Sequence, residues 1–87
     1  MNIKDVYYSQ KFSKQFLKLP TFIQEKVAIK ERIFKVNPLH NSLRLHQLHG
    51  VLNDLWFISI DRKYRIVFKR EPNGDILFIS IGKHDLY

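Results

Sequence analysis

The stretch LWFISIDRKYRIVFKREPNGDILFIS, residues 55–80, decides the fold. It contains three segments rich in β-branched and aromatic residues, which favour extended strands. Two polar turns separate the segments. The first is Asp61-Arg62-Lys63, and the second contains Asn73-Gly74, a pair typical of hairpins. The pattern predicts three antiparallel strands at about residues 55–61, 64–70 and 75–81.

Upstream of this stretch, the pattern changes to one strand and two helices. Residues 3–8 are typical of a strand. Ser9 is placed to cap a helix that runs to about Leu19, and Pro20 interrupts the helical pattern. Thr21 and Gln24 form a capping-box pattern that opens a second helix, which we expect to end at residues 37–38.

Each predicted helix has an apolar side that can cover a sheet. In the first helix this side carries Phe12, Phe16 and Leu19. The second helix is expected to use a broad apolar stripe. Its members are Phe22, Ile29, Ile33 and Val36, widened by Ile23, Val27 and Phe34. A short strand is also expected near residues 43–45.

Together these elements predict an α+β fold: β-α-α followed by an antiparallel three- to four-stranded meander. The helical hairpin should pack on one face of the sheet, and the other face should remain for a ligand. The 87 residues correspond to one domain, 1–87. A chain of this length needs a core dense in large apolar groups, and its seven Phe and four Tyr supply them.

The composition points to a polyanionic partner in a reducing compartment. The formal net charge is +7, and the chain has no cysteine, so a disulfide framework and a thiolate zinc site are excluded. The sequence has neither an apolar run long enough to span a bilayer nor the apolar region of a signal peptide. We therefore expect a cytoplasmic protein without a membrane partner.

Arg65 is the first candidate for chemistry. Because side chains alternate along a strand, Arg65 and Val67 share one face while Ile66 and Phe68 share the other, core-forming face. A guanidinium on the open face can bind a phosphate through two parallel hydrogen bonds. The alternative is an ordinary surface arginine paired with Asp61 or Asp54.

Histidines and a terminal tyrosine supply the remaining candidates. His46 suits proton transfer near neutral pH, although a histidine in an amphipathic loop is more often structural. His46 and His49 have no third metal ligand at suitable spacing. His84 is a candidate proton donor, and Tyr87 is a candidate base-stacking ring. The alternative for Leu86-Tyr87 is simple docking on the core.

This set matches the needs of metal-independent RNA cleavage. The 2′-hydroxyl of RNA is an internal nucleophile, so the reaction requires a base, an acid for the leaving 5′-oxygen and a cation at the phosphate. DNA lacks this hydroxyl and would not be cut by the same groups. The candidate RNA contacts besides the reacting groups are Arg44, His49, Arg62, Lys63 and Lys83.

The Tyr64–Phe68 run and the Gly82-Lys83-His84 ending resemble the RelE/ParE superfamily of bacterial toxin–antitoxin toxins. The chain looks closest to the mRNA interferases of the RelE, YoeB and YafQ type, and the resemblance covers nearly its whole length. It implies a toxin that cuts mRNA on the ribosome without a cofactor. It also implies a cognate antitoxin. The toxin would contact operator DNA only as part of the complex with this antitoxin.

The resemblance also implies residue roles. Arg65 matches the phosphate-binding arginine, His84 the general acid and Tyr87 a terminal aromatic, while His46 falls where related toxins carry the general base. The lysine cluster of the RelE type is missing, and Ile60 stands near the place of a second YafQ-type histidine. Two alternatives remain: a ParE-like inhibitor of DNA gyrase, and an inactive homologue that only binds an antitoxin.

Overall fold

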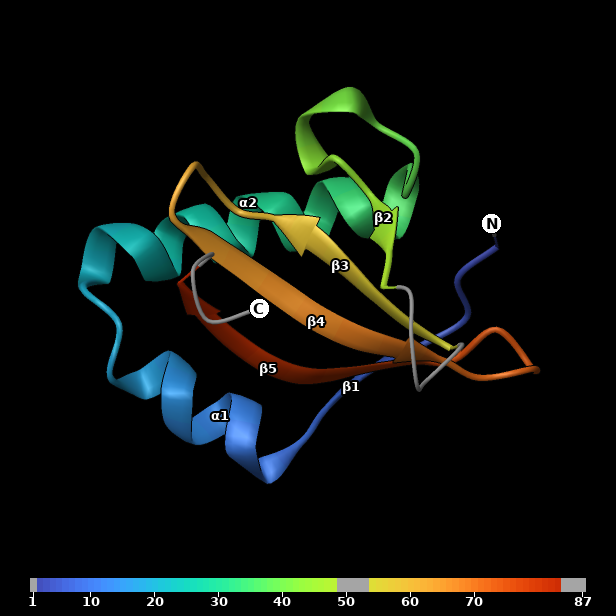
Figure 1. Ribbon diagram of the computed structural model, residues 1–87, viewed down its shortest axis with the longest axis horizontal. Helices are drawn as coiled ribbons and strands as arrows, with labels where there is room; N and C mark the ends of the chain where they lie inside the picture. Colours follow the sequence, from blue (N-terminus) through green and yellow to red (C-terminus); the bar gives the residue numbers. More distant parts are fainter. Residues whose placement is uncertain (1, 49–53, 84–87) are drawn as a thin grey trace.

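The computed structural model describes residues 2–48 and 54–83 as an α+β domain with two helices and a five-stranded mixed sheet (Figure 1). The strands lie in the order β1-β5-β4-β3-β2. Their bounds are β1 Val6–Tyr8, β2 His46–Gln47, β3 Leu55–Ser59, β4 Tyr64–Arg70 and β5 Ile76–Lys83. Strands β2 to β5 form the expected antiparallel meander, and β1 adds to β5 in parallel.

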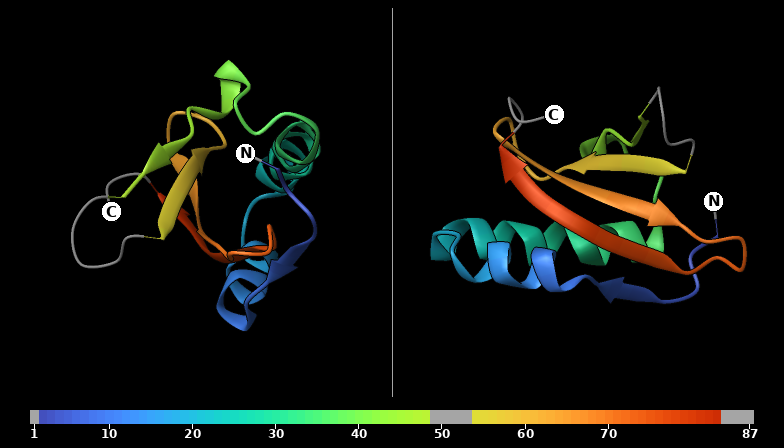
Figure 2. Two further views of the ribbon diagram at one scale, coloured as in Figure 1. Left: turned by 90° about the vertical axis from the view of Figure 1, so that its right-hand side faces the viewer. Right: turned by 60° about the horizontal axis from the view of Figure 1, so that its bottom comes forward.

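Both helices, α1 (Gln10–Leu17) and α2 (Thr21–Val36), cover the same face of the sheet (Figure 2). The opposite face is turned toward the viewer in Figure 1. Ser9 caps α1 as expected, since its hydroxyl oxygen accepts a hydrogen bond from the backbone N–H of Phe12 at 2.9 Å. The arrangement therefore leaves one sheet face open to a ligand.

The expected capping box at the start of α2 is wrong. Pro20 occupies the N-cap position and no side chain caps the helix. The amide of Gln24 instead donates to the carbonyl oxygen of Phe16 at 3.0 Å, which ties α2 to the end of α1. The carbonyl of Pro20 accepts from two backbone N–H groups of the first turn, so the helix begins without a side-chain cap.

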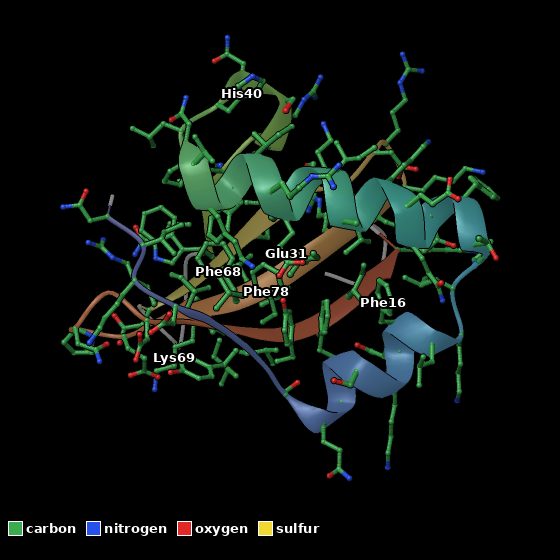
Figure 3. The ribbon with its side chains drawn as sticks, turned by 180° about the vertical axis from the view of Figure 1, so that it is seen from behind. Phe16, Glu31, His40, Phe68, Lys69 and Phe78 are labelled. Atoms are coloured by element: carbon green, nitrogen blue, oxygen red, sulfur yellow. The ribbon has the colours of Figure 1, made fainter. Side chains whose placement is uncertain are left out.

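The core lies between the helices and the sheet, and Figure 3 shows Phe68 and Phe78 below α2, over the strands. From α2 it takes Ile23, Val27 and Phe34. The expectation that Phe22, Ile29 and Val36 line the buried side is wrong, because their side chains are 60%, 47% and 87% exposed. Ile33, the fourth residue of that expected stripe, does pack against the core from a partly buried position. The fully buried contacts come from Ile23, Val27 and Phe34, which were expected only to widen the stripe.

Near residues 43–45 the expected strand is also displaced. A 3₁₀ turn, η1 (Asn41–Leu43), occupies the first part of this segment, and the strand β2 follows at His46–Gln47. Leu43 is fully buried and anchors the turn in the core. Arg44 follows in the left-handed region with φ 49°, which redirects the chain from the turn to β2.

The alternation of side chains between the two faces of the sheet shifts by one residue halfway along strand β5. Phe68 on β4 pairs with Phe78, but Val67 pairs with Ser80, so Ile79 is an extra residue. The bulge moves Ser80 to the face it shares with Val67 and returns Ile81 to the core. Simple alternation would have placed Ile81 on the open face.

Helix α1 completes the β5 edge where β1 stops. Strand β1 pairs with β5 only as far as Phe78. Beyond that point, the Ser9 hydroxyl donates to the carbonyl of Ile79 at 2.6 Å, and the Gln15 side-chain oxygen accepts from the N–H of Ile81 at 2.9 Å. Backbone groups of a buried strand need such partners, so these side chains replace the missing strand.

Because Ser9 both caps α1 and binds the bulge, we expect Ser9→Ala to lower the free energy of unfolding by about 1–2 kcal/mol. Ser13→Ala is the matched control. Ser13 lies exposed on the same helix and makes no side-chain hydrogen bond within the described residues. Urea denaturation of both variants measures the difference, and equal midpoints would contradict the double role of Ser9.

No helix in the described part of the chain is both long and apolar enough to cross a membrane.

Candidate active site

A groove of about 900 Å³ lies where the open face of the sheet meets η1 and β2. Its charged and titratable lining consists of Lys30, Arg44, His46, Asp61, Arg62 and Arg65. Four of these six side chains are cationic and one is a carboxylate, so the groove favours an anionic ligand. The lining comes from α2, from the η1–β2 segment and from the β3–β4 hairpin, which are far apart in the sequence.

Arg65 lies on β4 between Ser59 of β3 and Gly82 of β5. Its guanidinium carbon is 4.2 Å from the centre of the Phe57 ring, close enough for a cation–π interaction. Its Nε atom is buried and has no hydrogen-bond partner among the described residues. A buried donor without a hydrogen-bond partner lowers the stability of the fold. Such donors are found at binding sites, where a ligand can supply the missing acceptor.

The expected alternative for Arg65, an ion pair with Asp61 or Asp54, does not occur. Asp61 instead contacts the ammonium of Lys26 at 3.5 Å. The described ion pairs do not include Arg65. Its positive charge is therefore not neutralised by a carboxylate among residues 2–48 and 54–83.

His46 lies on the same groove as Arg65. It is exposed on β2, and it pairs in the sheet with Phe57. The two ring centres are 5.2 Å apart, within the usual range for aromatic pairs. Phe57 therefore contacts both His46 and Arg65, and the three side chains line one wall of the groove.

The other predicted residues divide into three groups. Arg44 and Arg62 line the groove with Arg65 and His46. Lys63 and Lys83 are exposed but do not line it. His49, His84 and Tyr87 lie outside the described residues.

Sequence reasoning missed two groove residues of consequence. Lys30 reaches the groove from the middle of α2, and its ammonium donates to the carbonyl oxygen of Ser42 at 3.4 Å. No local pattern distinguishes it from the other helical lysines. Phe57 was detectable in principle, since its strand pairing with Val67 puts it on the face of Arg65. Within the described chain, no group of three or more His, Asp or Glu side chains is placed to hold a metal ion.

Asp61 fixes the hairpin that carries Arg62 and Arg65. Its carboxylate accepts hydrogen bonds from the backbone N–H groups of Lys63 at 2.8 Å and Tyr64 at 2.9 Å. Partial burial alone would raise the pKa of Asp61, but these two donors and the ammonium of Lys26 hold it below its usual value. The turn is therefore held most firmly when Asp61 is ionised.

The pKa of Asp61 is lower in the folded state than in the unfolded state, so its charged form stabilises the fold. This stabilisation is fully present above the unfolded pKa of about 4. It is lost as the pH falls through the pKa of the folded state. Asp61→Asn keeps an oxygen for both N–H groups but removes the charge. We expect it to be less stable than wild type at pH 7 by at most about 1 kcal/mol, since the Lys26 side chain of the ion pair is 48% exposed and its charge is screened by solvent. Thermal unfolding between pH 7 and pH 2.5 should show this gap closing below about pH 4, whereas a constant gap would contradict the role of the charge.

No protein-family model and no curated protein matches the sequence. Solved structures do match the fold over nearly its full length. YafQ in the Escherichia coli DinJ–YafQ toxin–antitoxin complex superimposes with a TM-score of 0.75 at 19% identity, covering 95% of this chain and 94% of that one. A YoeB/ParE toxin from Agrobacterium tumefaciens gives 0.76 at 15% identity, with coverage of 93% and 99%. The archaeal RelE–RelB complex from Pyrococcus horikoshii gives 0.73 at 15% identity, with coverage of 95% and 96%.

Proposed function

We propose that this chain, which has the fold of the RelE/ParE superfamily toxins, is the toxin of a toxin–antitoxin module and cuts mRNA on the ribosome. Fold alone does not imply function. The observation that carries the proposal is Arg65, a guanidinium without a carboxylate partner among the described residues, in a cationic groove that it shares with His46. A gyrase inhibitor needs no such pair, so this observation favours the nuclease.

The groups proposed to form and break bonds all belong to this chain or to the RNA. His46 takes the proton of the 2′-hydroxyl as that oxygen attacks the adjacent phosphorus. The bond from phosphorus to the 5′-oxygen breaks, and His84 gives a proton to the leaving oxygen. The products are a 2′,3′-cyclic phosphate and a free 5′-hydroxyl. Arg65 stabilises the negative charge that grows on the phosphoryl oxygens during the attack.

The remaining cations of the groove suit the path of the RNA backbone. Lys30, Arg44 and Arg62 line the groove beside Arg65. Phosphate contacts from such side chains position a nucleic acid without reading its sequence. Binding should therefore weaken steeply as the salt concentration rises.

A cognate antitoxin is the second proposed partner. The matched structures include complexes named DinJ–YafQ and RelE–RelB. In this chain the +7 charge and the cationic groove favour an acidic segment that competes with RNA. Masking of the site would be excluded if a purified complex with a neighbouring acidic gene product left Arg65 fully accessible.

The test is cleavage of mRNA in a translating extract, with and without ribosomes, with the termini of the products mapped. We expect cuts only in translated message, with cyclic phosphate and 5′-hydroxyl ends. Intact message together with inhibited DNA supercoiling would instead support the gyrase alternative. Intact message, normal supercoiling and retained antitoxin binding would indicate an inactive homologue.

A further inference from the structure

The groove contains an aromatic ring that the proposed chemistry does not use. Phe57 lies on the open face of the sheet, yet it is only 9% exposed. It does not belong to the core cluster beneath the helices, which takes its β3 neighbour Ile58. Packing against the helices therefore does not account for a large apolar side chain in a groove lined mainly by charged and polar groups.

The ring contacts two of the proposed functional groups from neighbouring strands. His46 is directly opposite Phe57 on β2, with ring centres 5.2 Å apart. Arg65 on β4 is directly opposite Ser59, two residues further along β3. Its side chain therefore crosses the sheet diagonally to bring the guanidinium carbon to 4.2 Å from the Phe57 centre.

A ring face restrains a guanidinium differently from a carboxylate. A carboxylate would neutralise the charge and take up two of the N–H donors that a phosphate needs. An aromatic ring attracts the cation through its face and leaves the donors at the guanidinium edge for a ligand. The unpartnered Nε of Arg65 among the described residues fits the second arrangement.

We infer that Phe57 is a positioning residue of this site: its ring holds the guanidinium of Arg65 in the orientation for a phosphate and fixes His46 beside it. The assignment of a phosphate as the ligand rests on the proposed function. The restraint on Arg65 does not, because it follows from the contact itself. The two can therefore be measured separately.

The first measurement is the side-chain Nε–Hε resonance of Arg65 in wild-type protein by NMR. Protons above a ring face are shifted upfield, so we expect a displaced resonance that returns toward the free-arginine position in Phe57→Leu. Phe57→Tyr, which keeps the ring, should retain the displacement. Val67→Ala is the control for lost packing on the same face, because Val67 is 5% exposed and pairs with Phe57.

The second measurement is the steady-state rate of cleavage of ribosome-bound mRNA by the same variants. We expect Phe57→Leu to lower kcat by about 3- to 30-fold with little change in KM, the size of effect that a cation–π contact supports. Phe57→Tyr should restore most of the rate, and Val67→Ala should stay near wild type. A loss confined to kcat, together with its recovery in Phe57→Tyr, would distinguish a positioning role of Phe57 from a purely structural one.

A wild-type Arg65 resonance at the free-arginine position would overturn the inference without any variant having to fold. So would a folded Phe57→Leu protein with an unchanged resonance, or equal loss of rate in Phe57→Leu and Phe57→Tyr. A displaced resonance in a protein that leaves mRNA intact would support the restraint on Arg65 and contradict the proposed nuclease.

Discussion

Arg65→Ala is expected to reduce cleavage of ribosome-bound mRNA by about 10²- to 10³-fold, the loss typical of removing one group that stabilises transition-state charge. The guanidinium lies in the groove with His46 and has no carboxylate partner among the described residues, so its charge is available to a phosphate. Arg65→Lys should give an intermediate rate. It keeps the charge but loses the planar pair of donors that grips a phosphate.

Lys69→Ala is the matched control for Arg65→Ala. Lys69 lies on the same strand and shares the open face with Arg65, but it does not line the groove, and its ammonium is 3.8 Å from Glu71. Both variants lose one positive charge. If cleavage depends on the local role of Arg65, Lys69→Ala should stay within about threefold of wild type, the scale of a single exposed charge. Equal losses would indicate a general charge effect instead.

The same variant separates function from stability. Arg65→Ala removes a cation–π contact, which contributes about 0.5–2 kcal/mol, but it also removes a buried Nε that has no partner among the described residues. These effects oppose each other, so the free energy of unfolding should change by no more than about 1 kcal/mol. Chemical denaturation checks this. A large loss of stability would mean that Arg65 is a structural residue.

Phe34→Ala is expected to cost about 3–5 kcal/mol of stability, the range for deleting a fully buried phenyl ring. Phe34 is fully buried on α2, and its ring centre lies 5.1 Å from that of Phe68 and 5.9 Å from that of Phe78. These rings join the helix to two central strands. The total free energy of unfolding of a small domain is only about 5–15 kcal/mol, so the variant should be partly unfolded at 37 °C.

Phe22→Ala is the control, because it makes the same change on the same helix. Phe22 is 60% exposed, and its ring lies near the ammonium of Lys26. We expect a change within about 0.5 kcal/mol, as for other surface substitutions. Urea denaturation of both variants tests which stripe of α2 forms the core. Equal costs would contradict the observed burial.

The helices and the meander were predictable because their signals are local. The alternation of Arg65, Ile66, Val67 and Phe68 correctly assigned each to its face. The Asn73-Gly74 turn was also predictable, since Gly74 has φ 95°, a conformation that other residues rarely adopt. Such preferences act within a few residues, so they can be inferred without the rest of the chain.

The errors occurred where two local solutions were equally good. Helix α2 offers one stripe with Phe22 and Ile29 and another with Val27 and Phe34, and periodicity cannot choose between them. In the structure, Val27 and Phe34 are buried in the core while Phe22 and Ile29 are exposed, an outcome that depends on contacts with the sheet. The bulge at Ile79, which places both Phe78 and Ile81 in the core, was not predicted because no local sequence signal marks it.

The sequence by itself determined the class of the fold, the open face of the sheet and the presence of Arg65 on that face, because each depends on a period of two or of about 3.6 residues along the chain. Only the tertiary structure decided the neighbours of Arg65: a phenyl ring from β3, a histidine beyond that ring, and no carboxylate among the described residues. These neighbours come from segments that meet through strand pairing. Their distances are set by register and side-chain packing, which no local pattern encodes.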